Sequence, residues 1–275
     1  MNGGGLMIVL IKGAGDLASG VAHRLVKSGF KVVMTEISDP TMVRRTVSYG
    51  EAIYQGSMSI DGITAKSVDL GCDFELMWAK KEIPVLVDPD ASCIDILHPH
   101  VIVDGIIAKK NTGTYKDQAP LTIGLGPGFN AGADVDLVIE TMRGHNLGRV
   151  ICKGFAQPNT GVPGEIGGHS IKRLLKAPAE GIFIASHEIG DHVQEGTVIG
   201  RVGNTQVQTE IAGILRGLIK SGITVYKGMK IGDVDPRATK EYCFTISDKA
   251  RAIAGGVLEA ILSFCDEKTL QLEQF

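Results

Sequence analysis

The stretch MIVLIKGAGDLASGVAHRLVKSG, residues 7–29, predicts the start of an α/β fold. Its first five residues are an apolar run typical of a buried strand, and a glycine turn follows directly. Apolar residues then recur at helical spacing, and a second apolar run, FKVVMTEI at residues 30–37, leads to an acidic residue. Strand, tight turn, helix and strand in this order are typical of a dinucleotide-binding βαβ unit.

Within this stretch the residues match the pattern GxGxxA. Gly13 permits the tight turn, Gly15 lets a pyrophosphate approach the backbone, and Ala18 keeps the helix close to the sheet. The helix N-terminus supplies free N–H groups and a positive dipole. Glu36 follows at the spacing where a carboxylate accepts hydrogen bonds from ribose hydroxyls and disfavours a 2′-phosphate. The pattern predicts a cofactor-binding loop.

Asp16 argues for a second interpretation. Its carboxylate can cap the helix, and a negative group there would lie close to a bound pyrophosphate. The βαβ unit would then bind no nucleotide, and its glycines would serve packing alone. Both interpretations remain open at this point.

Two further apolar runs, residues 83–87 and 101–107, alternate with helical stretches such as residues 73–81. This alternation predicts a mainly parallel, doubly wound sheet. Lys109 and Lys110 follow the second run, where they could hold a phosphate or carboxylate or simply lie in a solvated loop.

A second glycine loop occurs in LTIGLGPGFNAGADVDLVIETMRG, residues 121–144. We expect a strand at 121–125, a loop containing Gly126, Gly128 and Asn130, and a helix over residues 133–142. A strand, glycine loop and helix direct backbone N–H groups at an anion. The two glycine loops would then bracket a small phosphate-bearing ligand, such as a dinucleotide or a pterin phosphate.

The C-terminal region contains a repeat, because residues 177–202 align with residues 209–234 at a constant offset. Neither copy has enough strands to bury its own apolar face, so the two copies should close on each other. We expect a small β barrel-sandwich of the biotinyl/lipoyl-like type. The hairpin that would carry the modified lysine has Gly203-Asn204 at its turn and no lysine. The sequence therefore predicts no biotin or lipoate.

Composition excludes several classes. The formal net charge of −3, from 28 basic and 31 acidic residues, argues against nucleic-acid binding. No segment approaches the length of a membrane span. Five cysteines without a CxxC pair favour a reducing cytoplasm. Cys93, His98 and His100 match no zinc signature, so no metal site is predicted.

Four regions are therefore predicted. Residues 1–153 form a Rossmann-like domain that binds a nucleotide or cofactor, and residues 154–176, rich in Gly, Pro and Asn, form a linker. Residues 177–237 form the biotinyl/lipoyl-like barrel. Residues 238–275 contain a helix capped by Ser247 that packs back on the first domain.

Three stretches together resemble the YqeB family: VLIKGAGDLASGVAHRL, IGLGPGFNAGADVDLVIETMRGHNLGRV and NTGVPGEIGG. The double repeat extends this resemblance over nearly the whole chain. The resemblance implies a bacterial accessory or maturation protein for a selenium-dependent molybdenum hydroxylase. The hydroxylase or its maturation proteins would be the partners, and a molybdopterin-type cofactor would be the ligand. The GxGxxA pattern and Glu36 indicate NAD as the other candidate cofactor. No catalytic residues can be carried over.

An NAD-dependent oxidoreductase of unknown substrate is the alternative function. The sequence shows no residue pair in register for hydride transfer, which favours the accessory role. The sequence leaves open whether the chain catalyses a reaction and whether it forms a homo-oligomer.

Overall fold

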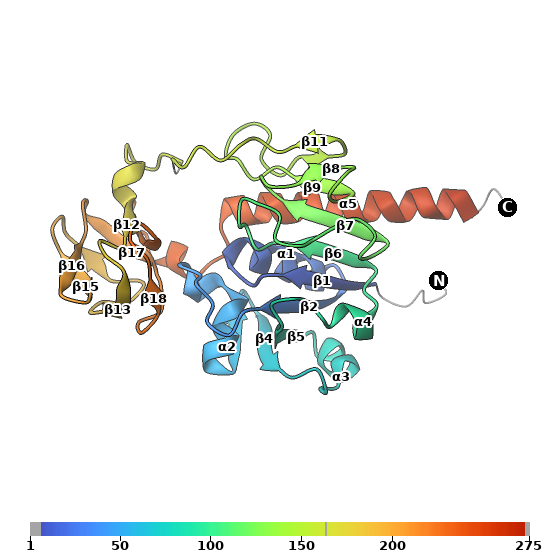
Figure 1. The fold of residues 1–275 in the computed structure, drawn as a ribbon, viewed down its shortest axis with the longest axis horizontal. Helices are drawn as coiled ribbons and strands as arrows, with labels where there is room; N and C mark the ends of the chain where they lie inside the picture. The colour runs from blue at the N-terminus through green and yellow to red at the C-terminus, as the bar shows by residue number, and fades with distance from the viewer. Residues whose placement is uncertain (1–6, 163, 273–275) are drawn as a thin grey trace.

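The computed structural model describes residues 7–162 and 164–272. Figure 1 shows two parts: an α/β part around a large sheet, and a β module of short strands beside one end of it. We call residues 174–235 the β module. A linker runs from the α/β part to the module, and helix α5 (Asp248–Leu272) returns the chain to the sheet.

The large sheet has nine strands in the order β10-β9-β7-β6-β1-β2-β5-β4-β3. Strands β1, β2, β4, β5, β6, β7 and β9 pair in parallel, whereas β3 and β10 pair antiparallel at the two edges. The strands are β1 (Ile8–Lys12), β2 (Lys31–Glu36), β3 (Ser57–Ile60), β4 (Ile63–Val68), β5 (Ile83–Val87), β6 (Val101–Asp104), β7 (Leu121–Leu125), β9 (Leu137–Ile139) and β10 (Val150–Ile151).

Helices cover the two faces of this sheet unequally. On one face α1 (Asp16–Lys27) and α5 pack together, and Gly20 allows the close approach of Ala250. Among the described residues, the helices on the opposite face are the short α3 (Phe74–Ala79) and α4 (Ile94–Leu97). The remaining short elements are η1 (Arg45–Val47), η2 (Tyr49–Glu51), α2 (Ala52–Gln55), the pair β8 (Asn130–Ala131) and β11 (Gly154–Phe155), η3 (Ile171–Arg173) and η4 (Lys240–Cys243).

These observations correct the predicted Rossmann-like, doubly wound nucleotide-binding fold. The sheet is mixed, with an antiparallel strand at each edge. The helix expected over residues 133–142 is absent, and strand β9 lies there instead. The carboxylate of Asp134 accepts a bond from the N–H of Asn130, and that of Asp136 accepts two from Thr122. Such side-chain bonds compete with helix formation.

The β module consists of two four-stranded antiparallel sheets, β12-β19-β17-β14 and β16-β15-β13-β18. The 32-residue repeat relates β13, β14 and β15 to β17, β18 and β19, and each sheet takes the short middle strand of the other copy. The strands are β12 (Leu174–Lys176), β13 (Gly181–Ala185), β14 (His192–Val193), β15 (Val198–Val202), β16 (Thr205–Gln208), β17 (Gly213–Leu218), β18 (Thr224–Val225) and β19 (Lys230–Asp235).

The predicted biotinyl/lipoyl-like barrel is therefore also wrong. Two separate sheets enclose one apolar core, which contains Phe183, Ile199 and Ile214. The glycine-rich repeat predicted two related copies that pack on each other. It did not predict that they form two separate four-stranded sheets. The two-residue turn at Gly203-Asn204 is confirmed, because Val202 pairs with Thr205 across it.

Helix α5 joins the module to the α/β part. The predicted cap is confirmed, since the N–H of Ala250 donates to Oγ of Ser247 at 3.2 Å. The apolar stripe of Ile253, Val257 and Ile261 is fully buried in the main core. Within the described ranges, no helix combines the length and apolar character needed to cross a membrane.

Candidate functional site

The first glycine turn is held by packing and by one carboxylate. Gly13 has a φ of +87°, and a Cβ there would lie 3.0 Å from the backbone of Ile106. A Cβ on Gly105 would lie 2.9 Å from the methyl group of Ala18. Gly15 faces open space, with nothing within 4 Å of an added Cβ. Gly13 and Ala18 therefore bring the turn and α1 close to the loop after β6.

Glu36 serves the same turn. Its Oε2 accepts a hydrogen bond from the N–H of Ala14 at 2.9 Å, and its Oε1 accepts one from Ile37 at 2.9 Å. Burial raises the pKa of this carboxyl, and the two backbone bonds only partly offset the effect. Both oxygens already have donors inside the protein, so the predicted ribose contact would have to share them.

Asp16 stands at the first position of α1, after the N-cap residue Gly15, and its side chain makes no capping bond. Its Oδ2 lies 3.6 Å from Nη1 of Arg44 instead. The negative charge that argued against an anion beside this helix is therefore partly balanced by a guanidinium.

The second glycine loop packs against the predicted lysine pair. Gly128 has a φ of +116°, and an added Cβ would lie 2.7 Å from the backbone nitrogen of Lys110. Gly126, with a φ of +77°, packs against the side chain of Thr141. The N–H of Asn130 donates to Asp134 at 2.8 Å. The backbone of Lys109 and Lys110 therefore occupies the space beside Gly128 in which the sequence predicted a phosphate.

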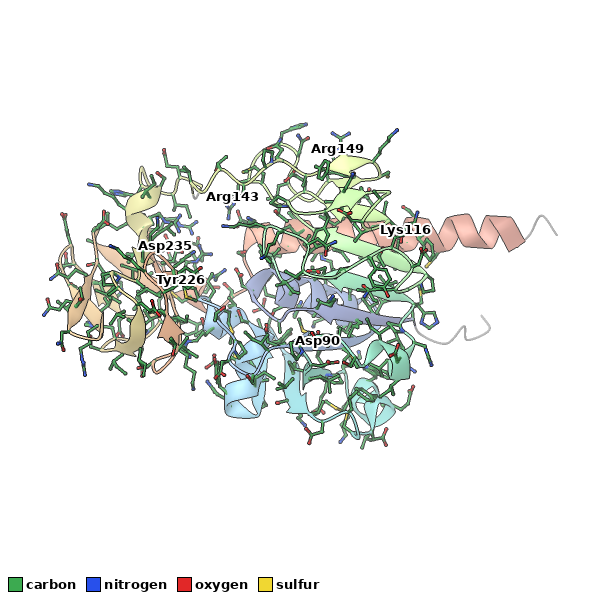
Figure 2. The ribbon with its side chains drawn as sticks, in the orientation of Figure 1. Asp90, Lys116, Arg143, Arg149, Tyr226 and Asp235 are labelled. Atoms are coloured by element: carbon green, nitrogen blue, oxygen red, sulfur yellow. The ribbon has the colours of Figure 1, made fainter. Side chains whose placement is uncertain are left out.

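A cleft of about 430 Å³ lies where the α/β part, the linker and the β module meet, and we call it the junction cleft. It opens at the carboxyl ends of β1, β6, β7 and β9. Arg143 lies on the α/β side of this junction and Asp235 on the module side (Figure 2). Linker residues between Gln157 and Ile166 line it as well.

The junction cleft is strongly cationic. Among its lining residues that the structure describes, two are acidic, Asp16 and Asp233, and seven are basic. The basic residues are Arg44, Lys109, Arg143, Arg173, Arg216, Lys230 and Lys249. A cleft lined by one sign of charge concentrates the field and attracts the opposite sign.

Only some of these charges are neutralised. Arg173 is buried and contacts both oxygens of Asp233 at 3.1 Å, and Arg143 contacts both oxygens of Asp248 at 2.8 and 2.9 Å. Lys109, Lys230 and Lys249 have no carboxylate within 4.0 Å in the described part of the chain.

Lys249 lies in the first turn of α5. Burial lowers the pKa of this amine, and the charges of Arg143 and Lys230 act in the same direction. Asp16 and Glu140 oppose them, but the net direction is downward. A lysine near the positive end of a helix dipole and beside other cations is a favourable position for an anion to bind.

Two residues of the predicted site, Asp16 and Lys109, line the junction cleft. The other eight do not line it: Gly13, Gly15, Ala18, Glu36, Lys110, Gly126, Gly128 and Asn130. A role for these residues in cofactor binding stays a prediction. No group of three or more potential metal ligands occurs among the described residues.

Sequence reasoning missed Arg216, the arginine that lines the cleft from the module. Arg216 stands inside the apolar run GILRGL of β17, where it is buried. A single arginine within a buried strand is unusual, since arginine is rarely buried without a partner. An arginine within this apolar run was the feature of the sequence that could have indicated a charged site.

Fold and cleft together define an α/β protein with a mixed sheet, an antiparallel β module and a cationic cleft between them. Over 258 residues the chain is 49% identical to the uncharacterized protein YqeB of Escherichia coli (strain K12). The match includes 94% of this chain and 48% of that protein, so the chain spans about half the length of the curated relative. This identity supports membership of the YqeB family.

Solved structures add little to this identification. The matches include an aspartoacylase family protein from Mesorhizobium loti, with a TM-score of 0.27 and 11% identity, covering 85% of this chain and 86% of that one. A succinylglutamate desuccinylase/aspartoacylase from Rhodobacter sphaeroides has a TM-score of 0.26 and 15% identity, covering 84% and 85%. Scores this low establish no shared fold or activity. No profile of a known protein family matches the chain.

Proposed function

We propose that this chain binds a small organic anion with more than one negative charge in the junction cleft. The observation that carries the proposal is the excess of seven basic over two acidic lining residues. Three of those basic residues, Lys109, Lys230 and Lys249, have no carboxylate neighbour in the described chain. Hydrogen bonds between such cations and an oxyanion are about twice as strong as neutral ones.

The size of the cleft supports an organic ligand rather than a simple ion. Its volume of about 430 Å³ falls within the range of roughly 300–1,000 Å³ that small-molecule sites occupy. The linker side chains of Gln157, Asn159 and Thr160 line the same space and offer hydrogen-bonding groups for an uncharged portion of the ligand.

An accessory role in molybdenum hydroxylase maturation rests on the resemblance to the YqeB family. A molybdopterin-type cofactor belongs to the proposed ligand class, because it bears a phosphate. We therefore propose it as one candidate ligand. The alternative, an NAD-dependent oxidoreductase, has no comparable support, because Glu36 already accepts backbone bonds with both oxygens.

Isothermal titration calorimetry with pyrophosphate, citrate and a pterin phosphate tests the proposal. Replacing one cleft lysine, as in Lys249→Gln or Lys230→Gln, should weaken binding about tenfold to a hundredfold, since a charged hydrogen bond contributes roughly 1.5–3 kcal/mol. Arg201→Gln is the matched control, because Arg201 is exposed on β15 and does not line the cleft. Equal binding by wild type, Lys249→Gln and Lys230→Gln would place the ligand elsewhere.

A further inference from the structure

Two arginines from different parts of the molecule are buried side by side at the junction cleft. Arg44 comes from the loop between β2 and η1 of the α/β part, and Arg216 comes from β17 of the module. Their side chains are only 10% and 9% exposed. Both line the cleft.

Both guanidinium groups have fewer acceptors than donors. Nη2 of Arg44 donates to the carbonyl oxygen of Tyr242 at 2.9 Å, and Nε of Arg216 donates to the same oxygen at 3.4 Å. These are the only hydrogen bonds of the two side chains within the described residues. A guanidinium has five N–H donors. Nε of Arg44 is buried and has no acceptor at all among the described residues.

Neighbouring carboxylates form ion pairs with these arginines but, among the described residues, make no hydrogen bond to them. Asp16 lies 3.6 Å from Arg44, and Asp235 lies 3.5 Å from Arg216. Asp235 is committed to Arg237, which donates to its two oxygens at 2.6 and 2.9 Å. Burial lowers the pKa of Arg216, and the charge of Arg44 lowers it further. The two guanidinium groups share one carbonyl oxygen as their acceptor. Several of their N–H donors therefore have no hydrogen-bond partner among the described residues.

We propose that an oxyanion group of the cleft ligand, a carboxylate or a phosphate, binds between Arg44 and Arg216. This inference rests on the proposed function and specifies where one charged end of the ligand lies. Arginine suits this position because its planar fork of donors matches the oxygens of carboxylate and phosphate groups. An acceptor placed there takes N–H donors of the two guanidinium groups that have no hydrogen-bond partner among the described residues, and it offsets the two positive charges.

The same ligand group would link the two parts of the protein. Residues 43–46 already lie against the module: the carbonyl of Val43 accepts from Leu218 at 2.8 Å, and Nε of Arg45 donates to the carbonyl of Leu218 at 2.9 Å. Oγ1 of Thr46 donates to the carbonyl of Cys243 in η4, the element that follows the module, at 2.5 Å. An anion between Arg44 and Arg216 adds a bridge beside these contacts. Binding should therefore slow the opening of this interface.

A double-mutant cycle with Arg44→Lys and Arg216→Lys tests the assignment. Both variants keep the charge and remove the guanidinium fork. Titrated with citrate and with pyrophosphate, each should bind about tenfold more weakly, and the double variant far less than a hundredfold more weakly, because both residues hold one group. Tighter binding of citrate indicates that the site holds a carboxylate, and tighter binding of pyrophosphate indicates that it holds a phosphate. Arg201→Lys should bind like the wild type.

Hydrogen exchange of the wild-type protein gives a measurement free of substitutions. With a bound probe, the backbone N–H of Leu218, which donates to Val43, should exchange several-fold more slowly. An unchanged exchange rate at Leu218 overturns the assignment of one shared group. A double variant whose loss of affinity equals the product of the two single losses overturns it as well. Normal binding by both variants, with weak binding by Lys249→Gln, overturns it and leaves the proposed function standing. If no probe binds the wild type, both proposals fail.

Discussion

The carboxylate of Glu36 and the backbone N–H of Ala14 are joined by a hydrogen bond of 2.9 Å. The acidic residue that ends β2 thus closes the glycine turn that follows β1. The second oxygen of the same carboxylate holds the N–H of Ile37. Glu36 therefore stabilises the edge of the sheet from which the junction cleft opens.

Removing this carboxylate should destabilise the protein. Glu36→Ala leaves the N–H groups of Ala14 and Ile37 without their acceptor, at a cost of about 1–3 kcal/mol each when buried. Glu36→Gln keeps one acceptor oxygen and should cost less. Urea unfolding of the two variants checks the order. Equal stability of Glu36→Ala and wild type would contradict the role in closing the turn.

The two glycine loops should tolerate a side chain differently. Gly128→Ala places a Cβ 2.7 Å from the backbone of Lys110 at a φ of +116°, and we expect a loss of at least about 2 kcal/mol in unfolding free energy. Gly15→Ala meets nothing within 4 Å, and its φ of −70° suits any residue. Its cost at the N-cap should stay within about 1 kcal/mol. Equal costs would contradict this distinction.

Lys249 should lose its proton at a lower pH than an ordinary lysine, whose pKa is about 10.4. Burial is the main cause, and Arg143 and Lys230 contribute. Competitive acetylation followed by peptide mass spectrometry gives the midpoint. Lys230→Gln should raise the pKa of Lys249, because a like charge is removed. Asp16→Asn should lower it, because an opposite charge is removed. Shifts in the reverse directions would contradict the charge assignment.

Asp235 should make the stability depend on pH. Burial alone raises the pKa of this carboxyl, but the bonds from Arg237 and the charges of Arg237 and Arg216 lower it overall. The stability it contributes is present above its unfolded pKa of about 3.9 and is lost as pH falls through the lower folded value.

Asp235→Asn should therefore lower the unfolding free energy at pH 7 by about 3 kcal/mol, because two arginines lose their buried partner. It should also flatten the decline below about pH 4. Urea unfolding between pH 7 and pH 3 measures both effects. Asp90→Asn is the control, because Asp90 is an exposed carboxylate remote from the module (Figure 2). A parallel decline in Asp235→Asn and wild type would contradict the assignment.

The hairpin between β15 and β16 should carry no covalent group. Its turn consists of Gly203 and Asn204, which offer no amine for an amide to biotin or lipoate. Intact mass measurement of the protein isolated from its own cells checks this expectation. A mass increase localised to residues 198–208 would contradict it.

Local sequence determined the elements whose neighbours in the chain settle their structure. The apolar runs at β5 and β7 begin and end at the predicted residues, because short apolar runs between turn residues bury a strand. Ser247 caps α5, and Gly203-Asn204 makes the hairpin, because both depend on contacts a few residues away. The repeat likewise predicted two related copies within the module.

Tertiary structure decided how these elements combine and where the site lies. A strand replaces the helix expected at residues 133–142, because Thr122, which bonds Asp136, becomes its neighbour only in the folded sheet. Arg44 and Arg216 belong to regions with no shared motif, and they meet because residues 43–46 dock on β17. Periodicity reports which face of an element is apolar, but it carries no information about which charged side chains distant segments bring together.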